Sequence, residues 1–209
     1  EIKGNINSDN DEFKLNFDSP SIKAFTNNFD KIKVNIDNKN PLYNVYIEMD
    51  SIKTKYYKIS NFSLINVTAK DTLFVRSEFK GGNKAQDYYN LNLYHTIDKN
   101  NNSVVGIQKS ELKFKDYLWF LNENNSGNNK IVFDKKFKNF SIENILMTHE
   151  KRKIALMGKL RDSTFKDLEL NFENVNLGKI IPSVDSLKVI GSLNGKINFK
   201  QNNKIYQPT

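Results

Sequence analysis

The sequence predicts an all-β protein, an elongated and curled antiparallel sheet of stacked strands with a few short helical turns. This architecture is a β-taco, or open β-groove. Three observations predict it. Apolar and polar residues alternate with period two along most of the chain, turn-forming residues interrupt the alternation at short intervals, and helical periodicity is almost absent.

Each alternating stretch has apolar residues at every second position, with Lys, Asn, Asp or Glu between most of them. The clearest stretches are Phe13-x-Leu15-x-Phe17, Ile32-x-Val34-x-Ile36, Val45-x-Ile47-x-Met49, Tyr89-x-Leu91-x-Leu93, Leu112-x-Phe114, Leu168-x-Leu170-x-Phe172 and Ile197-x-Phe199. The expected breaks are 37–41, 81–83, 98–103, 123–129 and 191–195. Short breaks of this kind predict about a dozen antiparallel strands.

Helical turns are expected at three places only. Pro20 opens a short candidate over 19–25, and Pro182 ends another over 175–181. The apolar stretch 117–122 is the third. None is long enough to form a stable helix without tertiary packing.

The beginning and the end of the chain share an internal pattern. Phe17 is followed by Ile22-x-x-Phe25, and Phe172 is followed at the same spacing by Leu177-x-x-Ile180. Such repetition is typical of layered arrays, in which each strand buries its apolar face only beside its neighbours. We therefore expect residues 1–209 to form a single continuous segment. Because the chain opens on Glu1 without an initiator Met, we also expect a larger parent protein.

The composition favours one-sided burial over a deep core, because only 38% of the residues are apolar while 12% are aromatic. The net charge of +8 comes almost wholly from Lys, since Arg occurs only at Arg76, Arg152 and Arg161. Proteins that read base edges rely on Arg. Single Lys residues at alternating positions instead indicate a solvated strand face, and a basic balance also suits an anionic lipid surface.

No residue pattern predicts catalysis, a metal site or a cofactor site. The chain has no Cys and two isolated His residues. Asp98-x-Asn100-x-Asn102 matches the start of an EF-hand loop, but Ser103 lies where Gly is needed and Lys109 where Glu is needed. We therefore expect a protein that is not an enzyme and holds no metal.

One basic and aromatic stretch, Phe133–Phe140, has two interpretations. Such residues form stacking platforms for single-stranded nucleic acid. The favoured interpretation is a strand and a turn whose Phe side chains face the common apolar side, so no nucleic acid is expected as a partner.

Residues 110–199 resemble the β-rich body of TamB-type translocation and assembly proteins of the AsmA-like superfamily. The resemblance lies in the order of strands, an aromatic segment, an Asn-rich break and a Gly-punctuated strand. The segments that carry it are Ser110–Phe114, Tyr117–Leu121, Asn129–Asp134, Phe140–Ile145, Lys153–Leu160, Asp167–Leu177 and Val189–Ile197.

The resemblance implies a hydrophobic groove that shields phospholipid acyl chains between the two membranes of a Gram-negative cell. It also implies a role in outer-membrane biogenesis and a periplasmic location. The parent protein would be anchored in the inner membrane and would reach the outer membrane. There its partner would be an Omp85-type barrel similar to TamA.

The expected groove lining consists of the apolar members of the alternating stretches. These are Phe13, Leu15, Phe17, Leu112, Phe114, Ile154, Leu156, Leu168, Leu170, Phe172, Ile197 and Phe199. Acyl chains suit such a lining because burial alone satisfies them. The alternative is a closed β-sandwich or repeat module that binds a protein or a glycan, which would bury the same faces against a second sheet.

Overall fold

The computed structural model describes residues 1–82, 84–114, 117–162, 164–180, 190–202 and 205–208. Strands dominate these residues, and the strand pairs with a defined register are antiparallel, which confirms the all-β prediction. The chain divides into two compact units, Glu1–Asn92 and Leu93–Thr209.

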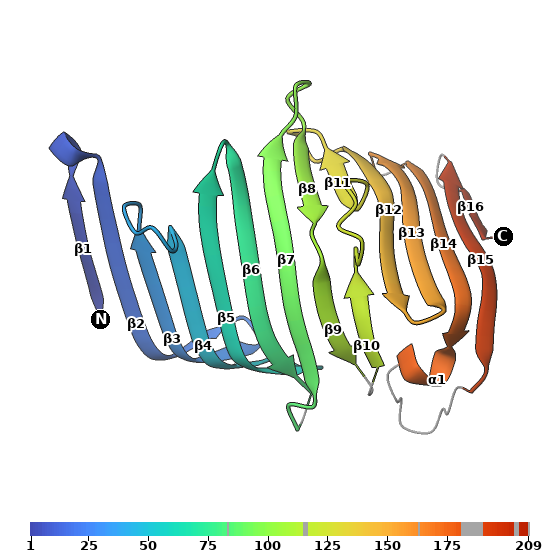
Figure 1. Cartoon of the computed structure of the whole chain (residues 1–209), viewed down its shortest axis with the longest axis horizontal. Coiled ribbons are helices and arrows are strands. Elements are labelled where there is room, and N and C mark those ends of the chain that lie inside the picture. Colours follow the sequence, from blue (N-terminus) through green and yellow to red (C-terminus); the bar gives the residue numbers. More distant parts are fainter. Residues whose placement is uncertain (83, 115–116, 163, 181–189, 203–204, 209) are drawn as a thin grey trace. The chain divides into compact units, whose positions relative to one another are not determined.

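The strands of the first unit lie side by side in chain order (Figure 1). They are β1 (Ile2–Asn7), β2 (Glu12–Ala24), β3 (Asn27–Asp37), β4 (Val45–Lys53), β5 (Lys58–Ala69), β6 (Thr72–Gly81) and the first six residues of β7 (Asp87–Ile97). A 3-10 turn, η1 (Ser8–Asn10), connects β1 to β2. This order follows from the short connections, which favour antiparallel neighbours.

The second unit contains the end of β7 and the remaining elements. These are β8 (Ser103–Ile107), β9 (Ser110–Phe114), β10 (Tyr117–Leu121), β11 (Lys130–Phe133), β12 (Asn139–His149), β13 (Arg152–Arg161), β14 (Phe165–Asn176), α1 (Leu177–Ile180), β15 (Ser192–Asn202) and β16 (Ile205–Pro208). The order from β7 is β8, β11, β12, β13, β14, β15 and β16, and β10 pairs with both β9 and β12.

Two of the three expected helical turns are wrong. Residues 19–24 continue β2 through Pro20, with Ser19 paired to Ile32 and Ser21 to Asp30 on either side of it. Proline is tolerated there because the pairing is interrupted at its position. The stretch 117–121 is strand β10, since its aromatic residues suit a pleated surface. The third expectation is met by α1 at 177–180, and Ile181 and Pro182 lie outside the described residues.

The expected break at 191–195 is also wrong, because β15 already begins at Ser192. Gly195 lies inside this strand, opposite Phe172, with a φ of 151°. Glycine adopts this conformation without the steric cost that a side chain would bring. Glycine therefore marks an irregular strand position here, and the chain does not turn at it.

Three asparagines hold β-bulges that shift the side-chain alternation. Asn61, Asn144 and Asn174 have φ values of 52°, 39° and 53°, and each lies at a register shift, in β5, β12 and β14. Asparagine tolerates the left-handed region better than most residues. Each bulge adds one residue to its strand, so apolar residues spaced by three rather than two still reach the same face.

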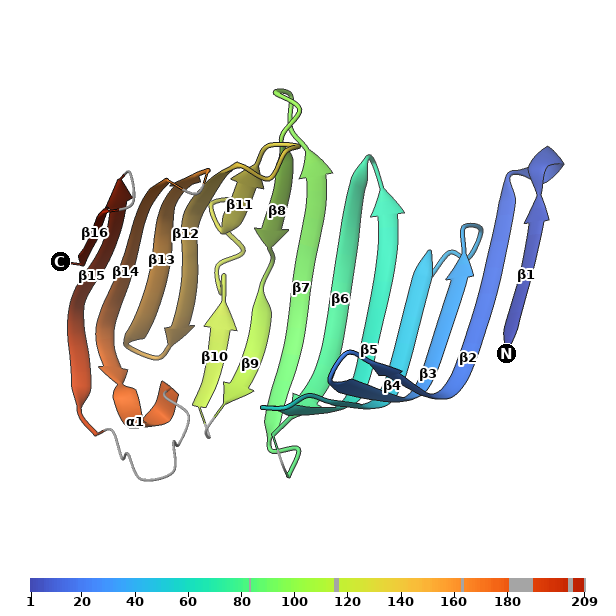
Figure 2. The same ribbon diagram turned by 180° about the vertical axis from the view of Figure 1, so that it is seen from behind.

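The first unit bends along a line that crosses β2–β5. Pairing is interrupted at Pro20 and Lys31 between β2 and β3, and at Asp50 and Asn61 between β4 and β5. Lys31 and Asn61 both have positive φ values, of 49° and 52°. Figure 2 shows the lower parts of these strands turning away from the upper parts. Bulges and proline thus curve this sheet, as the sequence pattern predicted only in general terms.

The bulge at Asn61 gives a direct test of this curvature. Asn61→Val should lower the free energy of unfolding by about 1–2 kcal/mol, because a β-branched residue is strained in the left-handed region. Asn61→Gly should leave it within about 0.5 kcal/mol, since Gly adopts that region freely. Because Asn61 is exposed, packing contributes little to either change. Urea unfolding measures the free energy change of each variant, and equal stability of the two variants would contradict the bulge assignment.

Candidate functional site

The register of the first unit places apolar residues in rows across one face of its sheet. Residues directly opposite each other in antiparallel strands point to the same side. One row runs over five neighbouring strands, β1 to β5: Ile2, Phe17, Val34, Ile47 and Leu64. The next rows add Leu15 beside Ile36, and Phe13 beside Ile6. The three groove residues expected from this unit therefore share one face.

The adjacent row of the first unit points to the other side and is polar throughout. It consists of Asp18, Lys33, Glu48, Ser63 and Glu78, in β2 to β6. This face also carries Ile65 and Phe74, but its strand centres are mainly charged or amide side chains. The sheet of the first unit is thus two-sided, as the period-two pattern predicted.

The second unit has the same sidedness. Leu156, Leu170 and Ile197 are direct neighbours in one row across β13, β14 and β15. Phe172 lies opposite Ile154 in the row on one side, and Leu168 lies opposite Phe199 in the row on the other. Seven of the expected groove residues therefore form a single apolar area on three strands.

Leu112 and Phe114 join the same face through the short hairpin of β9 and β10. Leu112 lies opposite Trp119, and two residues further along β10 Leu121 lies opposite Met147 of β12. Met147 in turn lies opposite Ile154. The register thus connects all nine groove residues expected from the second unit.

The opposite face of the second unit carries cross-strand ion pairs. Lys153 Nζ lies 3.0 Å from Glu173 Oε2, and Lys196 Nζ lies 2.8 Å from Glu169 Oε1. Their side chains are 29–50% exposed, so each pair contributes at most about 1 kcal/mol. The ion pairs mark the face of the sheet that remains in water, opposite the apolar face.

The apolar faces are only partly buried. Among the described residues, the buried hydrophobic side chains are Ile32, Val104, Trp119, Phe172 and Val175. Of the twelve expected groove residues only Phe172 is in that set, while Phe13 and Ile197 are 38% and 50% exposed. Extensive contiguous apolar surface of this kind marks a binding surface in a folded protein.

Several lining residues escaped the sequence analysis. Ile145 and Met147 join the apolar face because the bulge at Asn144 restores the alternation that Phe140 and Ile142 begin. Val175, which is fully buried, joins it through the bulge at Asn174. The signal was present in the sequence as an apolar spacing of three with an Asn inside it.

An aromatic and cationic cluster lies at the end of the second unit's apolar face where β12 ends. The rings of Tyr117 and His149 stack with their centroids 4.4 Å apart. Arg152 Cζ and Lys179 Nζ each lie 5.1 Å from the centroid of Tyr117. His149 Nδ1 is 2.8 Å from the carbonyl oxygen of Leu118, which fixes the orientation of the imidazole. The cluster is a set of cation–π and stacking contacts.

The first unit holds a phenol pair beside a buried carboxylate. The Tyr57 hydroxyl donates to Asp87 Oδ2 at 2.7 Å and lies 3.0 Å from the Tyr89 hydroxyl. Burial is the main cause that raises the pKa of Tyr57 and that of Tyr89. Both phenols are therefore protonated at neutral pH. Their hydrogen bonds hold Tyr57 against β7.

No described helix has the length and apolar character needed to span a bilayer. Within the described ranges, no three His, Asp or Glu side chains group in a way that could hold a metal ion. Comparison of the chain with models of protein families, with curated proteins and with solved structures finds no match. The candidate site therefore rests on the register and burial of its own residues.

Gly158 of β13 tests how closely the strands pack beneath the apolar face. It has a φ of 147°, and a Cβ there would lie 2.2 Å from the carbonyl oxygen of Asp167. Gly158→Ala should therefore lower the free energy of unfolding by about 1–3 kcal/mol. The matched control is Gly127→Ala, because a Cβ at Gly127 meets nothing within 4 Å. Urea unfolding of both variants checks the prediction, and an unaffected Gly158→Ala would rule out this packing.

Proposed function

We propose that this chain is a non-enzymatic lipid-binding segment whose apolar sheet faces shield phospholipid acyl chains from water. One observation supports the proposal above all others. In each unit a single sheet has one apolar face, and most side chains of that face remain partly exposed. A folded chain that exposes so much apolar surface gains from a ligand that covers it.

Acyl chains suit this surface for physical reasons. They need no hydrogen-bonding partners, and each methylene removed from water contributes about 0.8 kcal/mol. Rows such as Leu156, Leu170 and Ile197 present only hydrocarbon to a ligand. Strand rows also repeat along the sheet, so a tail can slide from one row to the next without losing a specific contact. This is the property that a conducting groove requires.

The resemblance of residues 110–199 to TamB-type proteins of the AsmA-like superfamily agrees with this proposal. We accordingly propose a periplasmic location and a parent protein that is anchored in the inner membrane and reaches the outer membrane. In that setting the chain serves outer-membrane biogenesis by carrying phospholipid, and its parent docks on an Omp85-type barrel similar to TamA.

The alternative is a closed β-sandwich that binds a protein or a glycan. A sandwich covers each apolar face with a second sheet. Within each unit the strands form one hydrogen-bonded sheet, which favours the lipid-binding surface. The two functions also differ in the effect of a charge on the apolar face, which would prevent folding in a closed sandwich but leave an open sheet folded.

Leu170→Asp should abolish lipid binding while leaving the chain folded. Leu170 lies between Leu156 and Ile197 at the centre of the apolar area, and it is only partly buried. A carboxylate there repels acyl chains but still reaches water, so the loss of stability should stay below about 2 kcal/mol. Mass spectrometry of lipid extracted from the purified variant and from wild type measures lipid binding, and thermal melting measures stability.

The matched control is Asn171→Asp, which adds the same charge on the same strand. Asn171 points to the polar face, where it lies opposite Lys196. This variant should keep both its lipid and its melting temperature. A Leu170→Asp chain that fails to fold would favour the closed sandwich. A folded Leu170→Asp chain with undiminished lipid would show that acyl chains do not occupy this face.

A further inference from the structure

The loop between β11 and β12 exposes an aromatic ring among lysines. Phe137 is 67% exposed, and its ring stacks on Phe133 with the centroids 5.2 Å apart. Lys135, Lys136 and Lys138 surround it in the sequence and are exposed. Exposed aromatic residues flanked by Lys are typical of segments that lie at an anionic membrane surface.

The loop itself is held in shape by Asp134. Its Oδ1 accepts the backbone N–H groups of Lys136, at 3.1 Å, and of Lys138, at 2.9 Å. The side-chain amide of Asn139 donates to Oδ2. These hydrogen bonds, that of the Lys138 N–H first, hold the pKa of Asp134 below its usual value. Phe137 is therefore presented by a preformed turn.

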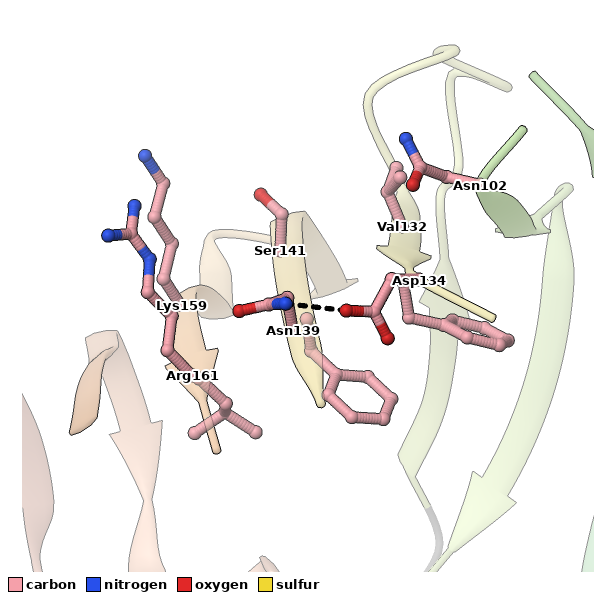
Figure 3. Close-up of a pocket in the computed structure, with 10 residues that line it drawn as sticks. Asn102, Val132, Asp134, Asn139, Ser141, Lys159 and Arg161 are labelled. Atoms are coloured by element: carbon pink, nitrogen blue, oxygen red, sulfur yellow. Dashed lines mark hydrogen bonds between the residues drawn. The ribbon is translucent and has the colours of Figure 1, made fainter. Parts of the chain in front are cut away.

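A cavity of about 390 Å³ adjoins this loop at the ends of β11, β12 and β13. Lys159 and Arg161 line one side, with Ser141 and Asn139 beside them, as Figure 3 shows. Lys159 lies directly opposite Ser141, and Arg161 opposite Asn139. The Arg161 guanidinium is placed by the Phe165 ring, whose centroid is 5.7 Å from Cζ. Two cations, a hydroxyl and an amide are thus gathered in one concave place, together with the single carboxylate of Asp134.

The carboxylates nearby already have partners. Asp134 accepts the loop hydrogen bonds, Asp162 Oδ1 lies 3.3 Å from Lys138 Nζ, and Asp167 Oδ1 lies 4.0 Å from Lys200 Nζ. In the part of the chain that the structure describes, neither Lys159 nor Arg161 has a carboxylate within 4.0 Å. The cavity therefore has an excess of positive charge that an anion can neutralise.

Apolar residues of the same cavity belong to the lipid-binding face. Phe133, Phe140 and Leu160 lie opposite one another across the ends of β11, β12 and β13, in the rows that continue through Ile131 and Ile142. The rings of Phe133 and Phe140 stack with their centroids 5.4 Å apart. Phe140 and Leu160 alternate with Ser141 and Lys159 along their strands, so their side chains point to the apolar face on the other side of the sheet, at the same strand ends as the cavity.

We propose that this cavity binds the phosphate of an anionic phospholipid at a membrane surface, with Lys159 and Arg161 as its ligands and Phe137 inserted among the headgroups. The inference rests on the proposed function, since the tails continue onto the apolar face beside Phe133 and Phe140. This end of the second unit is then where a lipid enters or leaves the sheet. The cluster of Tyr117 and His149 lies at the opposite end of β12 and is not part of this site.

Flotation of the whole chain with vesicles tests the site. Vesicles of phosphatidylcholine with about one third phosphatidylglycerol should bind the chain roughly tenfold more tightly than phosphatidylcholine alone. The double variant Lys159→Gln/Arg161→Gln should lose this preference. The matched control, Lys153→Gln/Lys196→Gln, removes the same charge from cations already paired with Glu173 and Glu169, and it should keep the preference.

The outcomes separate this inference from the proposed function. A wild-type chain without preference, or a double variant that retains it, overturns the phosphate site even if both chains still carry extracted lipid. Saturable binding of glycerol 3-phosphate, lost in the double variant, without any preference between vesicles, means that the cavity takes free phosphate and also overturns the inference. Vesicle preference in a chain whose apolar faces carry no lipid would instead support the site and count against acyl-chain shielding.

Discussion

The structure depends on one geometric constraint, the alternation of side chains along a strand. Successive residues of a strand point to opposite faces, so a shift of one residue would exchange the apolar and polar faces. The chain maintains this separation in two long strands with a bulge where the apolar spacing changes from two to three, at Asn144 and Asn174. The apolar faces, the ion-paired faces and the partly exposed lining all follow from it.

A single sheet with one apolar face stabilises itself differently from a packed domain. Side chains such as Leu156 and Leu170 gain contacts mainly from their neighbours across the strands, and only a few, such as Trp119 and Val175, are fully buried. Backbone hydrogen bonds and cross-strand pairs therefore carry much of the stability. Any ligand that covers the apolar face adds to that stability by mass action, which couples the binding of such a ligand to folding.

Regular strands could be predicted from the sequence, and irregular ones could not. Stretches such as Phe13–Phe17 and Leu168–Phe172 alternate cleanly, and both their strands and their faces were correct. At Pro20 the sequence predicted a helical turn and not a strand. The strand accommodates Pro20 because its pairing is interrupted opposite Lys31, which is distant in the sequence. The cavity beside Lys159 and Arg161 could not be predicted from the sequence either, because it forms only where the ends of three strands meet.

The central claim is that acyl chains occupy the apolar faces, and a tryptophan placed among the exposed lining residues reports on it directly. Ile197 is 50% exposed on the second unit's apolar face opposite Leu170, whereas Trp119, the single tryptophan of the chain, is buried. Bromine atoms quench indole fluorescence on contact, so a phospholipid with brominated tails should reduce the emission of the Ile197→Trp variant in a saturable manner and more than that of the wild-type chain, while the same lipid without bromine should not. Emission of the Ile197→Trp variant that is unchanged by the brominated lipid at saturating concentration would contradict the account.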